Sequence, residues 1–397
     1  MERVDNLNKQ IKEDKVIIKK CKHPSTVSVL LNNPKRLNSL DVHMFKKLND
    51  VVSDFNHKII IIRGVGDKAF SCGGDVKSLH KYITQKDDES LMQYFDSEFK
   101  MDYAYFLQNQ IPNCALITIY NGIAIGGSIT MSIYSKIRIC SENTLISLPE
   151  CKNGLLVPSI QYFSNLRDNL GVYLMMTGDF IKGEDCVKYG LADYFVEHSK
   201  LVDLQNELEM QENLESCHKI CKKYAQNIDV NQIRNKEYIK DLFQLTDFNT
   251  FWQNINQKAS QNQDLKLQKF AQHCLKQMNL SSKISIRVNY SMILSSFDSS
   301  ISFNQFMLLQ ARSAINLTKL STDCQEGLKK AVIDRNYIPQ WSHETVESVS
   351  QQEIDQILND ETQIQSFTRQ MIQSFDDVNN LFIQKQNYQN KLIDSII

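Results

Sequence analysis

Hydrophobic residues in the first third of the chain alternate between short strand-like runs and a helical stripe. Two apolar runs, 16–18 and 28–31, flank His23-Pro24-Ser25, and turn residues between two such runs predict a β-hairpin. Beyond Leu40 the apolar residues take the spacing of one helix face, which predicts a helix. The helical positions are Val42, Phe45, Leu48, Val51 and Val52.

Two later apolar runs, 59–62 and 116–119, predict strands, and each is followed by a glycine turn. The turns are Phe70-Ser71-Cys72-Gly73-Gly74-Asp75 and Asn121-Gly122-Ile123-Ala124-Ile125-Gly126-Gly127-Ser128. A Gly-Gly pair at the end of a strand lets a backbone N–H point outward, because no Cβ is in the way. Two such N–H groups that converge would stabilise charge on a carbonyl oxygen, as in an oxyanion hole. Either turn alone is equally typical of an ordinary tight turn, because short glycine motifs are common.

The pattern changes near residue 200, where Asn, Gln, Lys and Glu become frequent and the periodicity turns helical. Residues 201–280 carry several large aromatic side chains that need burial, so we expect amphipathic helices here. The last forty residues keep apolar positions at helical spacing, which are Ile354, Ile357, Leu358, Ile364, Phe367, Met371 and Ile372. This last segment is either a peripheral helix pair or a surface for protein partners.

Composition narrows the class of protein. The chain has 397 residues, of which 42% are hydrophobic and 23% charged, as is typical of a globular protein with one large domain and an extension. A formal net charge of −1 gives no overall attraction to nucleic acid or to an anionic membrane. No apolar run approaches the ~20 residues that span a bilayer. The ten cysteines lack disulfide or zinc spacing, so we expect reduced thiols and no metal site.

Motifs in the first half resemble those of the crotonase (enoyl-CoA hydratase/isomerase) superfamily. In order, they are Leu31-Asn32-Asn33-Pro34-Lys35-Arg36-Leu37-Asn38-Ser39-Leu40, the two glycine turns, Ser147-Leu148-Pro149-Glu150, Met176-Thr177-Gly178 and Tyr189-Gly190-Leu191-Ala192. The resemblance implies an α/β fold, a crotonase-like spiral of ββα units with a helical C-terminal extension. It divides the chain into a core with the acyl-CoA site (1–200), a helical region (201–345) and C-terminal amphipathic helices (346–397).

One motif in the helical region narrows the resemblance to a branch. Residues 323–341 read DCQEGLKKAVIDRNYIPQW, which is similar to the signature of 3-hydroxyisobutyryl-CoA hydrolases. The resemblance implies hydrolysis of a short 3-hydroxyacyl-CoA thioester in valine catabolism, with CoA as part of the substrate and no separate cofactor. It also implies a mitochondrial location. The acidic N-terminal residues, such as Glu2 and Asp5, are unlike a presequence, so a cytoplasmic location stays open.

The resemblance assigns the catalytic roles to three residues. The backbone N–H groups of Gly74 and Gly127 would form the oxyanion hole. Glu150 would be the catalytic carboxylate, which either attacks the thioester or activates water. An apolar site would raise the pKa of Glu150 towards neutrality. Thr130 stands where hydratases keep a second glutamate, which argues against hydratase activity.

Other residues would bind the substrate. Asp102 matches an acidic substrate contact of the hydrolase branch, and Arg36 and Leu37 match the cradle for the adenine and phosphates of CoA. Lys77 and either Lys329 or Lys330 are further phosphate candidates.

The segment 154–162 departs from the branch, because it lacks an aspartate and a glycine cluster, and Ser159 is the nearest polar substitute. A second hypothesis follows: a weak or inactive homologue that serves as a structural subunit of a mitochondrial assembly such as the mitoribosome.

Overall fold

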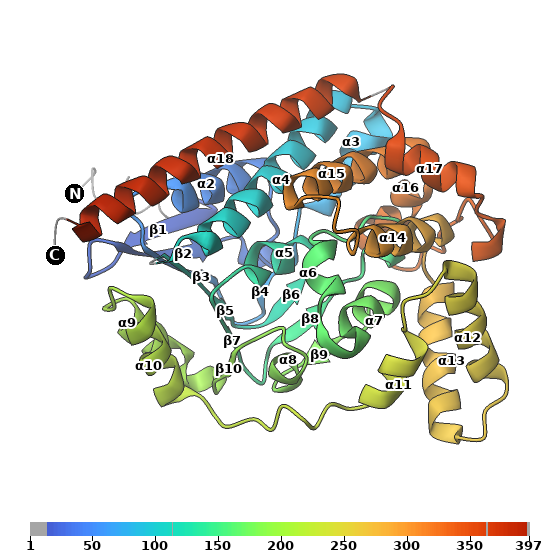
Figure 1. The fold of residues 1–397 in the computed structure, drawn as a ribbon, viewed down its shortest axis with the longest axis horizontal. Coiled ribbons are helices and arrows are strands. Elements are labelled where there is room, and N and C mark those ends of the chain that lie inside the picture. The colour runs from blue at the N-terminus through green and yellow to red at the C-terminus, as the bar shows by residue number, and fades with distance from the viewer. Residues whose placement is uncertain (1–13, 113, 363, 395–397) are drawn as a thin grey trace.

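A six-stranded sheet and a smaller four-stranded sheet form the centre of the molecule (Figure 1). The computed structural model describes residues 14–112, 114–362 and 364–394, so the acidic N-terminal residues lie outside it. The larger sheet has the order β1 (Val16–Lys20), β2 (Thr26–Leu31), β3 (Ile59–Gly64), β5 (Ala115–Tyr120), β7 (Ile137–Cys140) and β10 (Tyr194–Phe195). The smaller one has the order β4 (Ala69–Ser71), β6 (Ile123–Ile125), β8 (Leu145–Ser147) and β9 (Ile181–Lys182).

The predicted hairpin is present, because β1 and β2 pair antiparallel with Val16 opposite Leu31. The other pairs of the larger sheet are parallel and therefore need crossover connections. The helices of the core are α2 (Val42–Ser53), α3 (Val76–Gln85), α4 (Asp88–Gln110), α5 (Gly127–Ile133), α6 (Ile160–Ser164), α7 (Leu170–Thr177) and α8 (Asp185–Lys188). The order of strand, strand and helix repeats along the chain, which confirms the predicted spiral of ββα units.

The isoleucine-rich strand β3 is buried on both faces. Ile60 and Ile62 belong to the main core, whereas Ile59 and Ile61 pack with a second cluster that includes Leu204. This cluster comes from α9 (Leu201–Leu208) and α10 (Leu214–Tyr224), which cover the outer face of the sheet (Figure 1). Packing therefore joins residues up to 224 to the core, beyond the boundary at residue 200 that the change in composition predicts.

The rest of the chain is helical. Its helices are α11 (Lys236–Leu242), α12 (Phe248–Ser260), α13 (Leu265–Asn279), α14 (Lys283–Ser295), α15 (Phe303–Leu320), α16 (Asp323–Leu328), α17 (Gln351–Asn359) and α18 (Gln365–Asp394). None of the helices among the described residues is long and apolar enough to span a membrane. All ten cysteines are unpaired.

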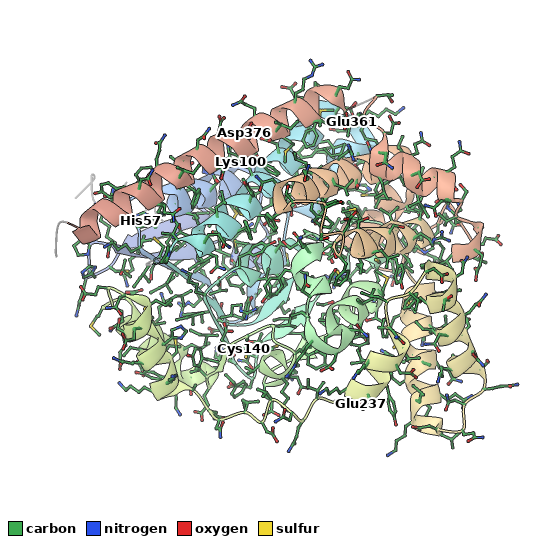
Figure 2. The ribbon with its side chains drawn as sticks, in the orientation of Figure 1. His57, Lys100, Cys140, Glu237, Glu361 and Asp376 are labelled. Atoms are coloured by element: carbon green, nitrogen blue, oxygen red, sulfur yellow. The ribbon has the colours of Figure 1, made fainter. Side chains whose placement is uncertain are left out.

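Helix α18 runs along α4 and α2, as Figure 2 shows near the labelled Lys100 of α4 and Asp376 of α18. Phe375 of α18 packs on Tyr103 of α4 with ring centroids 4.7 Å apart. Most of the apolar positions that suggested a partner surface are buried in the chain's own core, although Ile372 is 43% exposed. The apolar stripe is thus largely used within the molecule.

Candidate active site

The two glycine turns touch each other, because each follows a strand of the smaller sheet. Gly73 and Gly126 have backbone φ angles of +83° and +61°, which residues with a side chain rarely adopt. A Cβ on Gly73 would lie 2.7 Å from the Ile125 oxygen and 2.9 Å from the Gly127 nitrogen. Only glycine therefore allows the turns to approach this closely.

This contact brings the backbone N–H groups of Gly74 and Gly127 together. A Cβ on Gly127 would lie 3.6 Å from the Gly74 nitrogen. Neither N–H has an acceptor among the described residues, and Gly127 is the first residue of α5, where an N–H has no partner in the helix. Leu40 fixes the first turn, because its N–H donates to the Gly73 oxygen at 2.8 Å and its oxygen accepts from the Asp75 N–H at 2.7 Å. The sequence-predicted pair thus presents two free donors.

Glu150 lies beside these donors. It begins the 3-10 turn η2 (Glu150–Asn153), directly after Pro149. Its Oε1 is 2.9 Å from the position that a Cβ of Gly126 would take, and its Oε2 has no partner among the described residues. Burial raises the pKa of Glu150 to about 8, and the nearby charge of Glu98 also raises it.

Glu98 is a second carboxyl at the same point, which the sequence analysis missed. It lies on α4, with its Oε1 2.6 Å from the position of a Gly127 Cβ and 3.8 Å from that of a Gly74 Cβ. Burial raises the pKa of Glu98 to about 7. The glycine N–H groups are therefore close to two buried carboxyls, and one group can hold a proton while the other is charged.

Asp102 does not reach the site, in contrast to its predicted role as a substrate contact. It lies one helical turn after Glu98 and is fully buried in the core. Burial raises the pKa of Asp102 well above its usual range, with a further contribution from the charge of Glu98, and neither carboxyl oxygen has a hydrogen-bond partner among the described residues. Thr130 is itself buried and donates to the Gly127 oxygen at 2.7 Å. Of these two acids of α4, Glu98 is thus the one beside the glycine pair.

A cavity of about 110 Å³ contains both glutamates and the glycine pair. Its wall is mostly apolar and aromatic, with Leu79, Tyr94, Phe95, Phe99, Leu155, Leu156, Pro158 and Ala314. A Cβ on Gly74 would lie 1.7 Å from the Tyr94 hydroxyl, so the wall leaves no room for a side chain at residue 74. The cavity accepts only a small group.

A larger groove of about 690 Å³ leads away from this cavity and shares Cys72, Gly74 and Val76 with it. Its cationic lining residues are Lys35, Arg36, Lys77 and Arg335. Leu37 lies in the same lining, whereas Lys329 and Lys330 do not. The Lys329 ammonium instead sits 3.8 Å from the ring centre of Tyr337. A basic groove that ends at a small cavity suits a long anionic ligand with a small acyl end.

Helix α16 of the helical half packs against η2. A Cβ on Gly154, whose φ is +69°, would lie 2.5 Å from the Asp323 carbonyl, and one on Gly327 would lie 2.4 Å from the Asn153 carbonyl carbon. Helix α16 therefore packs with its backbone directly on the turn that carries Glu150. Asp323 accepts from the Ser282 hydroxyl at 2.6 Å and from the Ser342 N–H at 2.7 Å. The motif at residues 323–341 thus helps to hold the turn that carries Glu150.

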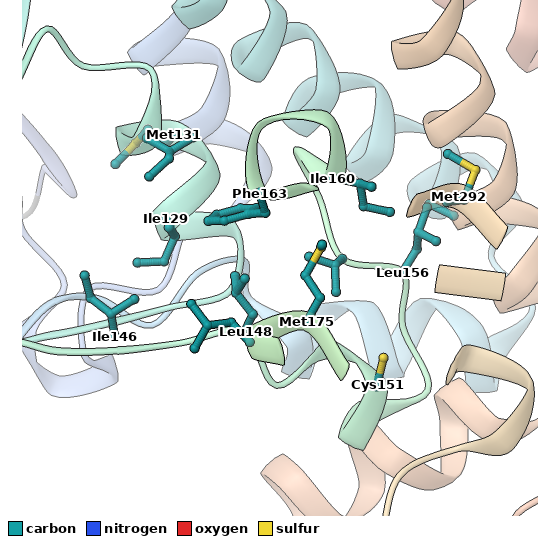
Figure 3. Close-up of a cluster of buried hydrophobic side chains, with 14 of the residues drawn as sticks. Ile129, Met131, Ile146, Leu148, Cys151, Leu156, Ile160, Phe163, Met175 and Met292 are labelled. Atoms are coloured by element: carbon teal, nitrogen blue, oxygen red, sulfur yellow. The ribbon is translucent and has the colours of Figure 1, made fainter. Parts of the chain in front are cut away.

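Helix α14 holds the divergent segment 154–162. Asn289 accepts from the Val157 N–H at 2.7 Å and donates to the Leu155 oxygen at 3.0 Å. Figure 3 shows apolar side chains around this segment, with Leu156, Ile160 and Phe163 among those labelled. Ser159 is 1% exposed, has a φ of +51° and lies outside the cavity lining, so the structure does not bring this predicted substrate contact to the cavity.

Comparison with known proteins agrees with this architecture. The model of the enoyl-CoA hydratase/isomerase family matches residues 26–358. The mitochondrial 3-hydroxyisobutyryl-CoA hydrolase of Dictyostelium discoideum is 27% identical over 337 residues, which cover 82% of this chain and 87% of that protein. The protein of that name from Xenopus tropicalis is 29% identical over 343 residues, with 82% and 84% covered.

Solved structures share the fold. A carnitinyl-CoA dehydratase from Mycobacterium thermoresistibile has a TM-score of 0.75 at 16% identity, with 88% of this chain and 97% of that chain covered. An enoyl-CoA hydratase from Rhodobacter sphaeroides has a TM-score of 0.71 at 22% identity, with 87% and 97% covered. The chain belongs to the enoyl-CoA hydratase/isomerase family.

Proposed function

We propose that this member of the enoyl-CoA hydratase/isomerase family hydrolyses the thioester of a short 3-hydroxyacyl-CoA, such as 3-hydroxyisobutyryl-CoA. The observation that carries the proposal is the pair of free N–H groups of Gly74 and Gly127 beside the buried carboxyl of Glu150. The relatives named 3-hydroxyisobutyryl-CoA hydrolase support the choice of reaction and substrate.

The groove and the cavity suit the two ends of such a substrate. The phosphates of CoA would interact with Arg36, Lys77 and Arg335 in the basic groove. The pantetheine arm would pass Cys72 and Val76, which line both spaces, and bring the thioester to the glycine pair. The acyl group would then occupy the small apolar cavity, which favours short chains.

In the reaction, the carbonyl oxygen accepts hydrogen bonds from the Gly74 and Gly127 N–H groups as it gains negative charge. The loss of one such donor typically costs about 3 kcal/mol of barrier. Glu150 acts in its charged form. It either attacks the carbonyl carbon, which gives an anhydride that water then hydrolyses, or it removes a proton from the attacking water. In both routes the carbon–sulfur bond breaks and the thiolate of CoA takes up a proton.

The pKa of Glu98 is raised to about 7, below the value of about 8 for Glu150, and its Oε1 faces the glycine pair. Glu98 would therefore lose its proton first, and its charge would oppose ionisation of Glu150. The site therefore contains two carboxyls even though Thr130 replaces the second glutamate of hydratases.

The proposal extends to pathway and location. The relatives are named as mitochondrial enzymes, which supports a mitochondrial location and a place in valine catabolism. The substrate carries CoA, and the proposed chemistry needs no other cofactor. The hypothesis of an inactive structural subunit rests on the divergent segment 154–162, whereas the relatives and the cavity, which keeps its donors and carboxyls, favour an enzyme.

The test is release of CoA from 3-hydroxyisobutyryl-CoA by the purified protein, with Glu150→Gln and Glu237→Gln compared. Glu237 is exposed and lies on α11, so its variant is a matched control for loss of one carboxylate. We expect turnover by the wild type and by Glu237→Gln, and a loss of at least a hundredfold for Glu150→Gln. Absence of wild-type turnover with a folded protein would overturn the proposal.

A further inference from the structure

A second hollow lies between the core and the helical region, away from the active site. It has a volume of about 720 Å³ and is lined from β9 and α8 on one side and from α11 and α13 on the other. Its lining shares no residue with the active-site cavity or with the basic groove. Its volume lies in the range of small-molecule sites.

Aromatic side chains line part of this hollow, and Tyr173, Tyr238 and Phe270 form its aromatic floor. The Phe270 ring lies 5.8 Å from that of Tyr173 and 6.2 Å from that of Tyr238, measured between centroids. Phe180 lines the same hollow and is 55% exposed, which is unusual for phenylalanine. The rings of Tyr173 and Tyr238 are tilted by 42° and 36° against that of Phe270, so a planar group could stack on one ring and contact the edges of the others.

Four cations line the hollow, which are Lys182, Arg234, Lys266 and Lys269. None of them forms an ion pair with a described residue, whereas the neighbouring Lys188 pairs with both Glu184 and Asp185. Unpaired cations on a rim are often only solvated. These cations come from separate segments and line the same hollow as the aromatic rings, which favours a binding site.

The carboxylates near the hollow already have partners. Asp179 accepts from the Tyr173 hydroxyl at 2.6 Å and lies 2.7 Å from His273 Nε2. Asp264 accepts from the Tyr238 hydroxyl at 2.9 Å. Asp185 lies 3.1 Å from the Lys188 ammonium. Lys188 balances Asp185, and the four cations of the lining outnumber the charges of Asp179 and Asp264, so the net charge around the hollow is positive.

We propose that this hollow binds a mononucleotide, with its base on the aromatic floor and its phosphate among the four cations. An aromatic surface alone would favour a neutral ring, and cations alone would favour any anion, so the combination points to a ring that carries phosphate. Because these four cations lie in one small hollow and the chain has a net charge of −1, a single nucleotide fits better than a nucleic-acid strand. The proposal does not rest on the thioesterase function.

The test is calorimetric titration of the full chain with AMP, adenosine and inorganic phosphate. We expect saturable one-to-one binding of AMP, with adenosine and phosphate each at least tenfold weaker. Phosphate that binds as tightly as AMP would contradict a role for the aromatic floor. Phe180→Ala, at an exposed position, should weaken AMP binding severalfold and leave phosphate binding unchanged.

Charge-reversal variants locate the site. The pair Lys182→Glu and Lys269→Glu should weaken AMP binding at least tenfold, while the exposed control pair Lys46→Glu and Lys222→Glu, on α2 and α10, should not. AMP binding should also persist in Lys77→Glu, which alters the basic groove alone. Binding that Lys77→Glu abolishes would assign AMP to that groove and overturn the proposal, as would the absence of binding at millimolar AMP.

Discussion

The two sides of the active site contribute different things. The first 150 residues supply every group that we propose to touch the thioester, namely Gly74, Gly127, Glu98 and Glu150. The helical half supplies no proposed reacting group, but α16 packs on the turn that carries Glu150 and α14 holds the segment after it. The helical half therefore positions the carboxyl of Glu150, and variants on the two sides should lower the proposed activity by different routes.

Among the variants that test the role of the helical half, Gly327→Ala should cause the largest loss of activity. Its Cβ would meet three backbone atoms of Asn153 at 2.4 to 2.6 Å, and backbone cannot move aside as a side chain can. We expect displacement of η2, a loss of at least a hundredfold in kcat/KM and a lower free energy of unfolding by about 1–3 kcal/mol. Steady-state kinetics and urea unfolding measure both.

Gly190→Ala is the matched control for that variant. Unlike Gly327, Gly190 has a positive φ, of +74°, and a Cβ there would meet only Leu166 at 3.8 Å. The alanine should therefore lower stability through backbone strain and leave kcat/KM nearly unchanged. If both variants lose activity in proportion to stability, α16 has no special role in positioning Glu150.

On the reacting side, removal of the Glu150 charge should stabilise the fold at alkaline pH. The folded-state pKa of Glu150, about 8, is above the ordinary value of 4.5, so the native state binds more protons than the unfolded state between these pH values. Wild-type stability should then fall as pH rises through this window, by on the order of 5 kcal/mol from this group. Urea unfolding at pH 5, 7 and 9 should show Glu150→Gln gaining on the wild type as pH rises. Parallel curves would contradict the burial of this carboxyl.

Leu156 from the first half of the chain and Ala314 from the helical half both line the cavity that we propose for the acyl group. Substitutions at these two positions should change the preference for acyl chain length in opposite directions. Leu156→Ala, in the first half, enlarges the cavity and should move the preference towards longer acyl chains by about tenfold in kcat/KM. Ala314→Phe, on α15, fills the cavity and should lower kcat/KM for the short substrate by a similar factor. A series of acyl-CoA thioesters of increasing length measures both. Unchanged chain-length profiles in both variants would place the acyl group elsewhere.

The smallest effect should come from Arg335, the basic groove residue from the helical half. Because this cation would meet only the phosphates of CoA, Arg335→Ala should raise KM severalfold and leave kcat nearly unchanged. Lys330→Ala is the control, since Lys330 lies outside the groove lining and should change neither value. A fall in kcat for Arg335→Ala would show that the groove also orients the thioester.

The sequence predicted much of the core, because its signals there are local. The β-branched run of β3 and the turn residues at 23–25 act on their own neighbours, and the strands form where those patterns indicate. Gly74, Gly127 and Glu150 come from motifs whose order matches a family. Their convergence at one cavity follows from the ββα topology, which brings the ends of β4 and β6 together.

The remaining features of the site depend on contacts between distant segments, which no local sequence pattern reveals. Glu98 and Asp102 lie one turn apart on a helix that is buried on most sides, so apolar spacing did not reveal which of them faces the cavity. Glu98 could have been found as the other acid on that helix face. The packing of Gly327 on Asn153 joins distant segments, and the cations of the second hollow come from three separate places in the chain, of which α13 supplies two cations.

The pH dependence of kcat/KM in the wild type and in Glu98→Gln tests most directly the claim that two coupled, buried carboxyls serve the glycine pair. The account predicts that wild-type kcat/KM rises with pH with a midpoint near 8, because Glu150 must lose its proton. Glu98→Gln should lower that midpoint, because the charge of Glu98 helps to raise the pKa of Glu150. A midpoint near the ordinary glutamate value, or one that is the same in both proteins, would contradict the account.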